Sequence, residues 1–115
     1  MTASITEMPE RERPISEQYR VVAKAWADAE AAAHVLEETK SAVFSQKCVA
    51  LGDMPVNRAE QTVKASQEWF EHLEKIVAAR REANLKKVQL EYLRMRFSEW
   101  QATDANHRSE RRMSR

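Results

Sequence analysis

The chain has 115 residues, with 19 basic and 18 acidic side chains and a net charge of +1. It contains one glycine and three prolines, far fewer than folds rich in turns and strands use. This composition argues against a β-sandwich, a β-barrel, a Rossmann unit and any nucleotide site built on a glycine-rich loop. The length allows one small domain.

Residues 1–14 carry many charges and little that can be buried, so we expect a disordered lead-in. Pro14 suits the first turn of a helix, where its missing N–H would have no partner anyway. The segment 15–50 has no proline or glycine and is rich in alanine, which predicts a long helix. Small and apolar residues recur along it at steps of three and four: Tyr19, Val22, Trp26, Ala29, Ala33, Leu36 and Val43. The alanines in the middle of this stripe allow a partner helix to approach closely.

The segment 51–57 is the one clear break in the helical pattern. Gly52 can adopt the left-handed conformation that ends a helix, and Pro55 cannot continue one. Asn57 followed by Glu60 matches a capping box, which predicts a second helix that starts near Arg58. No proline or glycine interrupts the chain after this point, so this helix is expected to run over 58–107.

The second predicted helix has apolar residues on more than one side. Its first half places one face along Val63, Ser66, Phe70, Leu73, Val77 and Asn84, with Trp69, Ile76 and Ala83 beside it. Further on there are two lines: one of Leu85, Val88, Tyr92 and Met95, another of Leu90, Leu93, Phe97 and Trp100. A helix that is apolar on two sides needs more than one neighbour.

These elements predict an all-α fold, a long antiparallel helical hairpin that resembles a coiled coil and forms a single domain over 15–112. The first helix is shorter than the second and is expected to cover it only to about residue 92. Aromatic side chains beyond that point would project from the hairpin, and such patches usually mark an interface. We therefore expect a homo-oligomer, a dimer or a larger helical bundle, with an oligomer or partner interface at Leu90, Tyr92, Leu93, Phe97 and Trp100.

Charge is unevenly distributed: residues 78–115 hold ten basic and five acidic side chains, a net +5, whereas residues 1–56 sum to −3. Basic and aromatic residues alternate in this half, as in proteins that follow a phosphate backbone and stack on bases. The candidate nucleic-acid contacts are Arg80, Arg81, Lys87, Arg94, Arg96, Arg108, Arg111 and Arg112. Helix packing of the aromatic residues and antiparallel self-association explain the same pattern.

Catalytic, metal and cofactor chemistry have no support in the sequence. His34, His72 and His107 lie in different segments without the i, i+4 spacing of zinc ligands, and Cys48 is the single cysteine. No catalytic residues, metal or cofactor are therefore expected, and the protein is interpreted as a non-enzyme. No apolar run approaches a membrane span, and the first residues are polar, so we expect a cytoplasmic protein that does not bind membranes.

The segment 58–113 carries several short motifs: an aromatic residue before Glu71-His72-Leu73, then AARREAN, R-x-R-F-x-x-W and A-x-x-R-x-E-R. In these motifs it resembles small helical proteins encoded by tailed bacteriophages and prophages. Those proteins are mostly of unassigned function, and some are encoded near replication and recombination genes. The resemblance implies location in the cytoplasm of a bacterial host and supplies no catalytic residue.

Two functional hypotheses follow. The first is a phage-type helical interaction protein that self-associates and binds a protein partner. The alternative is a nucleic-acid-binding accessory protein of phage replication or recombination, which would use the basic C-terminal half.

Overall fold

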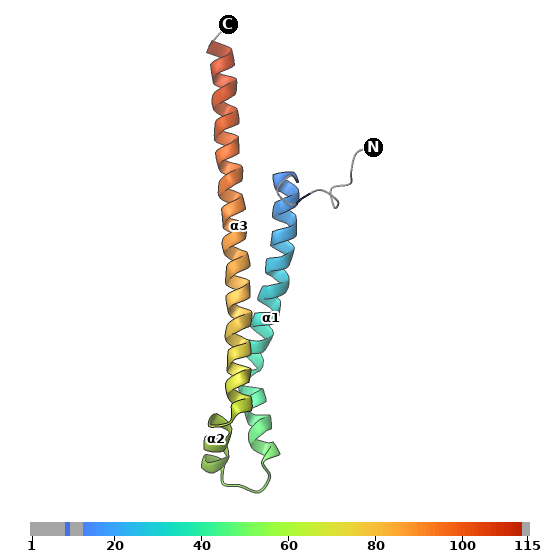
Figure 1. Ribbon diagram of the computed structural model, residues 1–115, viewed down its shortest axis with the longest axis vertical. Helices are drawn as coiled ribbons and strands as arrows, with labels where there is room; N and C mark the ends of the chain where they lie inside the picture. The colour runs from blue at the N-terminus through green and yellow to red at the C-terminus, as the bar shows by residue number, and fades with distance from the viewer. Residues whose placement is uncertain (1–8, 10–12, 114–115) are drawn as a thin grey trace, which may run out of the picture. The chain divides into compact units, whose positions relative to one another are not determined.

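The computed structural model describes Pro9 and residues 13–113, and its regular structure there consists of three helices: α1 (Ile15–Ala50), α2 (Val56–Lys64) and α3 (Gln67–Met113) (Figure 1). No strand occurs among these described residues. The expected all-α class and the pairing of α1 with α3 are confirmed. The expected disordered lead-in lies outside the described residues, apart from Pro9, Arg13 and Pro14.

The chain forms two compact units, and each contains part of α1 and part of α3. The turn unit comprises Ala27–Asn84, and the terminal unit comprises Met1–Trp26 together with Leu85–Arg115. The turn unit also contains α2, and the division falls within α1 and α3 rather than at a linker.

The core of the turn unit is built on small side chains in its middle and on aromatic rings near the turn. Ala33 of α1 and Ala83 of α3 are both 0% exposed. Small side chains at a helix contact allow a short distance between the helix axes. Closer to the turn, the Phe44 and Trp69 ring centroids are 5.1 Å apart, and Trp69 also stacks on His72.

The structure buries one of the adjoining apolar lines in the first half of α3. Trp69, Ile76 and Ala83 are buried at seven-residue intervals, whereas Phe70 and Val77 are exposed. Of the apolar positions that the sequence pattern places on this half of the helix, the buried line is thus that of Trp69, Ile76 and Ala83, about 100° around the helix from Phe70 and Val77. Apolar residues at neighbouring positions make both faces compatible with the sequence pattern, and the contact of Trp69 with α1 selects one of them.

Both ends of α1 follow the sequence signals. The Pro14 carbonyl accepts the backbone N–H groups of Glu17 and Gln18, each at 3.0 Å, which starts the helix. After Ala50 the chain turns at Gly52, which has a φ of 82° and whose N–H donates to the Val49 carbonyl at 3.0 Å. A positive φ is strained for a side chain with Cβ, so glycine suits this position.

The start of the next helix corrects a prediction. Helix α2 begins at Val56 rather than near Arg58, its N-cap is Pro55, and no side-chain cap hydrogen bond forms there. The Pro55 carbonyl instead accepts the Ala59 N–H at 2.9 Å. Asn57 lies within the first turn of α2, so the capping box expected from Asn57 and Glu60 is absent. Proline fixes φ near the helical value, which allows the helix to begin directly after it.

The second predicted helix is also divided, because α2 ends at Lys64 and α3 starts at Gln67 (Figure 1). At the break, the Ser66 hydroxyl donates to the Val63 carbonyl at 2.6 Å and accepts the Trp69 N–H at 3.2 Å. Ser66 is thus the N-cap of α3: its oxygen satisfies an N–H that has no partner within the helix. The sequence pattern did not separate this serine from an ordinary helical position. Helix α3 then continues beyond His107 to Met113.

We predict that Ser66→Ala lowers the free energy of unfolding by about 1 kcal/mol, the usual cost of removing a serine N-cap. Chemical denaturation followed by circular dichroism measures the change, with Ser41→Ala at an exposed position within α1 as the control. An unchanged or increased free energy of unfolding in Ser66→Ala would mean that α2 and α3 fuse at no cost and that the cap is unimportant.

Candidate functional site

The most unusual surface of the terminal unit is a line of large apolar side chains on α3. Leu85, Val88, Tyr92 and Met95 follow one another at steps of three, four and three, and each is between 51% and 61% exposed. These steps keep the four side chains on one side of the helix. We call this set the outer face.

The buried side of the same helical segment faces away from the outer face. Leu90 and Leu93 are both buried and belong to the apolar core of the terminal unit. Two of the five predicted interface residues therefore serve the chain's own fold. Leu90 lies within the part of α3 that the first helix was expected to cover, and Leu93 lies just beyond it.

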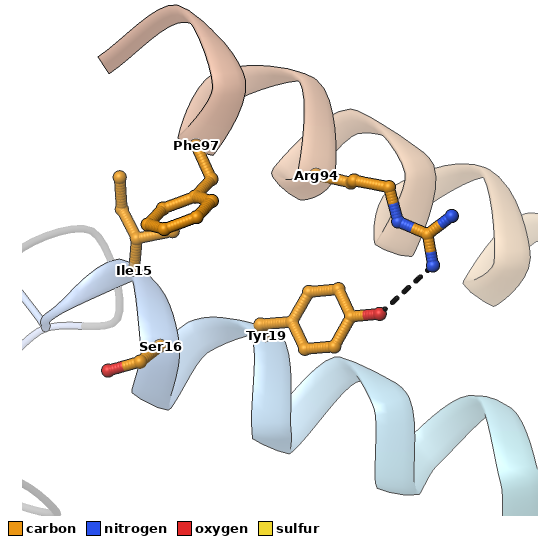
Figure 2. Close-up of a pocket in the computed structure, with 5 residues that line it drawn as sticks. All are labelled: Ile15, Ser16, Tyr19, Arg94 and Phe97. Carbon is orange, nitrogen blue, oxygen red and sulfur yellow. Dashed lines mark hydrogen bonds between the residues drawn. The ribbon is translucent and has the colours of Figure 1, made fainter. Parts of the chain in front are cut away.

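The contact at the start of α1 shows how far α1 reaches along α3. Ile15, Ser16 and Tyr19 of α1 line an open pocket of about 340 Å³ with Arg94 and Phe97 of α3. Figure 2 shows the Phe97 ring beside the Ile15 side chain. Coverage of α3 thus extends to Phe97 rather than ending at about residue 92.

The two remaining predicted interface aromatics lie at and beyond this pocket. Phe97 and Trp100 are exposed, and their rings stack with centroids 6.1 Å apart and planes 20° apart. Because Phe97 also lines the pocket with Ile15, it is partly used within the chain. Of the five predicted interface residues, Tyr92 is the one on the outer face.

Arg94 was predicted as a nucleic-acid contact, and the structure gives it a partner within the pocket. Its Nη2 donates to the Tyr19 hydroxyl oxygen at 3.2 Å (Figure 2). This hydrogen bond raises the pKa of Arg94 above its ordinary value. The contact ties α3 to the first turns of α1.

Arg80, another predicted nucleic-acid contact, is held between two carboxylates of α1 in the turn unit. Its Nε donates to Glu37 Oε2 at 2.9 Å, its Nη2 donates to the second oxygen of the same carboxylate, and its Nη1 donates to Glu30 Oε2 at 2.7 Å. Two parallel bonds to one carboxylate are the strongest geometry for such a pair. The hydrogen bond from Arg80 lowers the pKa of Glu37, and the two carboxylates raise the pKa of Arg80. We call this arrangement the Arg80 clasp.

The other predicted cations do not share one face of α3. Arg108 pairs with Asp104 one turn earlier at 3.1 Å. Lys87 and Arg96 are nine residues apart, about two and a half turns, and so point to opposite sides of the helix. No ion pair among the described residues involves the following side chains: Arg81, Lys87, Arg96, Arg111 and Arg112.

The histidines and the cysteine occupy packing or surface positions. His72 stacks on Trp69 at 5.5 Å, His34 is exposed, and His107 lies 3.8 Å from Glu110. Cys48 is a half-buried free thiol that lines an open pocket of about 580 Å³ beside the turn. Within the described part of the chain, no three or more His, Cys, Asp or Glu residues are grouped so that they could hold a metal ion.

Sequence reasoning named the line of Leu85, Val88, Tyr92 and Met95 but did not select it as the interface. The distinguishing signal was the seven-residue spacing of Trp69, Ile76, Ala83 and Leu90, which marks the face that α1 covers. Had that spacing been used to orient the helix, the outer face would have followed as its opposite side.

We predict that Arg80→Met destabilises the fold and makes its stability less dependent on pH. A carboxylate with a lowered pKa in the folded state stabilises the fold above its ordinary pKa of 4.5, and that contribution is lost as pH falls through the lowered value. The difference in unfolding free energy between the native protein and Arg80→Met should therefore be largest near neutral pH and shrink in acid.

Chemical denaturation at neutral pH and at a pH well below 4.5 tests this prediction. Lys75→Met, which removes an exposed cation from the same helix, is the matched control and should change stability little at either pH. An equal effect of Arg80→Met at both pH values would contradict a role for the Glu37 carboxylate.

Comparison with known proteins gives no relative for this chain: no protein-family model, no curated protein and no solved structure matches it. In the described part of the chain, no helix has both the length and the apolar character needed to span a membrane. The outer face and the basic residues of α3 are therefore the features that bear on function.

Proposed function

We propose that this chain is a non-enzymatic helical interaction protein that self-associates and binds a protein partner. The observation that carries the proposal is the outer face, where four large apolar side chains on one side of α3 are about half exposed. Contiguous apolar surface of this kind usually marks a site of interaction, whereas single exposed apolar residues are ordinary.

The spacing of the outer face supports a helix as its partner. Steps of three and four residues along α3 match the repeat with which one helix inserts its side chains between those of another. Complete burial of a leucine, valine or methionine contributes about 1.5–3 kcal/mol relative to full exposure. Covering four half-exposed side chains on each partner therefore supplies a driving force for association.

The proposal includes a cytoplasmic location in a bacterial host and a relationship to the small helical phage proteins that the segment 58–113 resembles. Both rest on the motifs of that segment and on its polar, charged composition.

Nucleic-acid binding is the second candidate function. The net charge of residues 78–115 and the cations without ion pairs favour it. Against it, Arg80 and Arg94 are bonded within the fold, Arg108 is paired, and the others are distributed around α3. A phosphate backbone is bound most effectively by cations gathered on one surface.

We predict that Val88→Lys weakens self-association at least tenfold because a charged side chain then has to be buried in the interface. Lysine is a better helix former than valine, so helicity should be retained. Sedimentation equilibrium across a dilution series measures the dissociation constant.

Val35→Lys is the matched control, because Val35 of α1 is 58% exposed and Val88 is 61% exposed. The Val35→Lys substitution should leave the dissociation constant for self-association unchanged. A native protein that is monomeric at every concentration would overturn the self-association part of the proposal, and equal weakening by both variants would remove the outer face as its site.

We predict that labelled single- and double-stranded DNA binds only weakly, and that this binding disappears at moderate salt. Scattered cations neutralise few phosphates at once, so little affinity survives when salt competes for them. Fluorescence anisotropy at low and moderate salt measures the binding. Tight binding at moderate salt that is abolished by Arg111→Glu with Arg112→Glu would instead establish the second candidate function.

A further inference from the structure

The spacing of the four outer-face residues is the same when it is read in either direction along the helix. Leu85 and Met95 lie five residues to either side of position 90, and Val88 and Tyr92 lie two residues to either side of it. The steps of three, four and three are the same in both directions. A second α3 that runs antiparallel therefore presents apolar side chains at every position where this one does.

Charged residues extend the symmetry at both ends. Helix α3 is continuous from Gln67 to Met113, and Arg81 precedes Leu85 by four residues while Glu99 follows Met95 by four. Both side chains are exposed, and neither forms an ion pair among the described residues. In an antiparallel pair of helices centred on position 90, Arg81 lies opposite Glu99 of the second copy, and this pairing occurs twice.

A parallel arrangement of the same face is less favourable. It places Arg81 opposite Arg81 and Glu99 opposite Glu99, so like charges meet at both ends of the contact. It also places Tyr92 against Tyr92 and Val88 against Val88. The antiparallel arrangement pairs the large Tyr92 ring with the small Val88 side chain, which distributes volume evenly along the contact.

We infer that the outer face binds the outer face of a second copy of this chain, antiparallel, with the two-fold axis at position 90. The inference rests on the proposed function and names the occupant of its interaction surface. The observations that carry it are the symmetric spacing of the four apolar residues and the opposite charges at equal distances beyond them.

Charge reversal tests the geometry. Arg81→Glu and Glu99→Arg each place like charges together at both ends of the dimer, and each should raise the dissociation constant about tenfold at low salt. The double variant recreates opposite charges in the swapped order and should restore the dissociation constant to within about threefold of the native value.

Lys87→Glu is the matched control for Arg81→Glu, because it makes the same change in net charge at an exposed position on another side of α3. It should leave the dissociation constant close to the native value. Equal weakening by Lys87→Glu and Arg81→Glu, or a double variant weaker than either single one, would overturn the inferred register.

Spin labels measure the helix direction without changing these charges. In a Cys48→Ser background, labels at Thr103→Cys should lie about 39 Å apart along the helix axis, because Thr103 falls opposite Val77 of the second copy. Labels at Gln89→Cys should be separated along the axis by only about 3 Å. A parallel dimer would bring both pairs of labels to about 10 Å, the distance between two packed helices.

The outcomes separate this inference from the proposed function. A dimer that ignores the charge reversals, or one with both label pairs close together, overturns the antiparallel geometry while self-association stands. A native chain that remains monomeric at every concentration overturns both.

Discussion

The packing of α1 against one side of α3 is the interaction on which the rest of this structure depends. In the turn unit Ala33 and Ala83 have no exposed surface, and in the terminal unit Leu90 and Leu93 are buried. Helix α3 has apolar residues on two sides, but α1 covers only one of them. Val88 and its neighbours are therefore exposed because they lie on the side of α3 that α1 does not cover.

Polar side chains stabilise the packing of α1 against α3 at specific positions. Ser66 caps α3 and so sets where the long helix starts. The Arg80 clasp joins α3 to Glu30 and Glu37 of α1 through charge-assisted hydrogen bonds, and Arg94 makes a similar link to Tyr19. Some of the cations that were predicted to contact nucleic acid, Arg80 and Arg94, thus hold α3 to α1. Composition shows how many cations a segment has, whereas their availability depends on what lies across the helix from them.

The two sides of α3 differ in their surroundings, because one side is buried and the other is exposed. The inner side combines Ala83 with larger side chains such as Trp69, Ile76 and Leu90, and all of them are buried. The outer face is formed by Leu85, Val88, Tyr92 and Met95 at coiled-coil spacing, and residues of opposite charge, Arg81 and Glu99, lie beyond its ends. The proposed interaction surface is therefore on the side of α3 opposite to the one that packs in the core.

Much of the fold was determined by the sequence itself. The lack of glycine and proline within the segments that became α1 and α3 made helices unavoidable, and Gly52 with Pro55 set the position of the turn. These are local effects, decided by backbone freedom and hydrogen bonding within a few residues. Only the tertiary structure decided which side of α3 is buried and which arginines are engaged, whereas the Ser66 cap depends on hydrogen bonds within three residues of it. Apolar residues recur with helical spacing on two sides of α3, so the spacing alone does not tell which side is buried. The contact with α1 decides it.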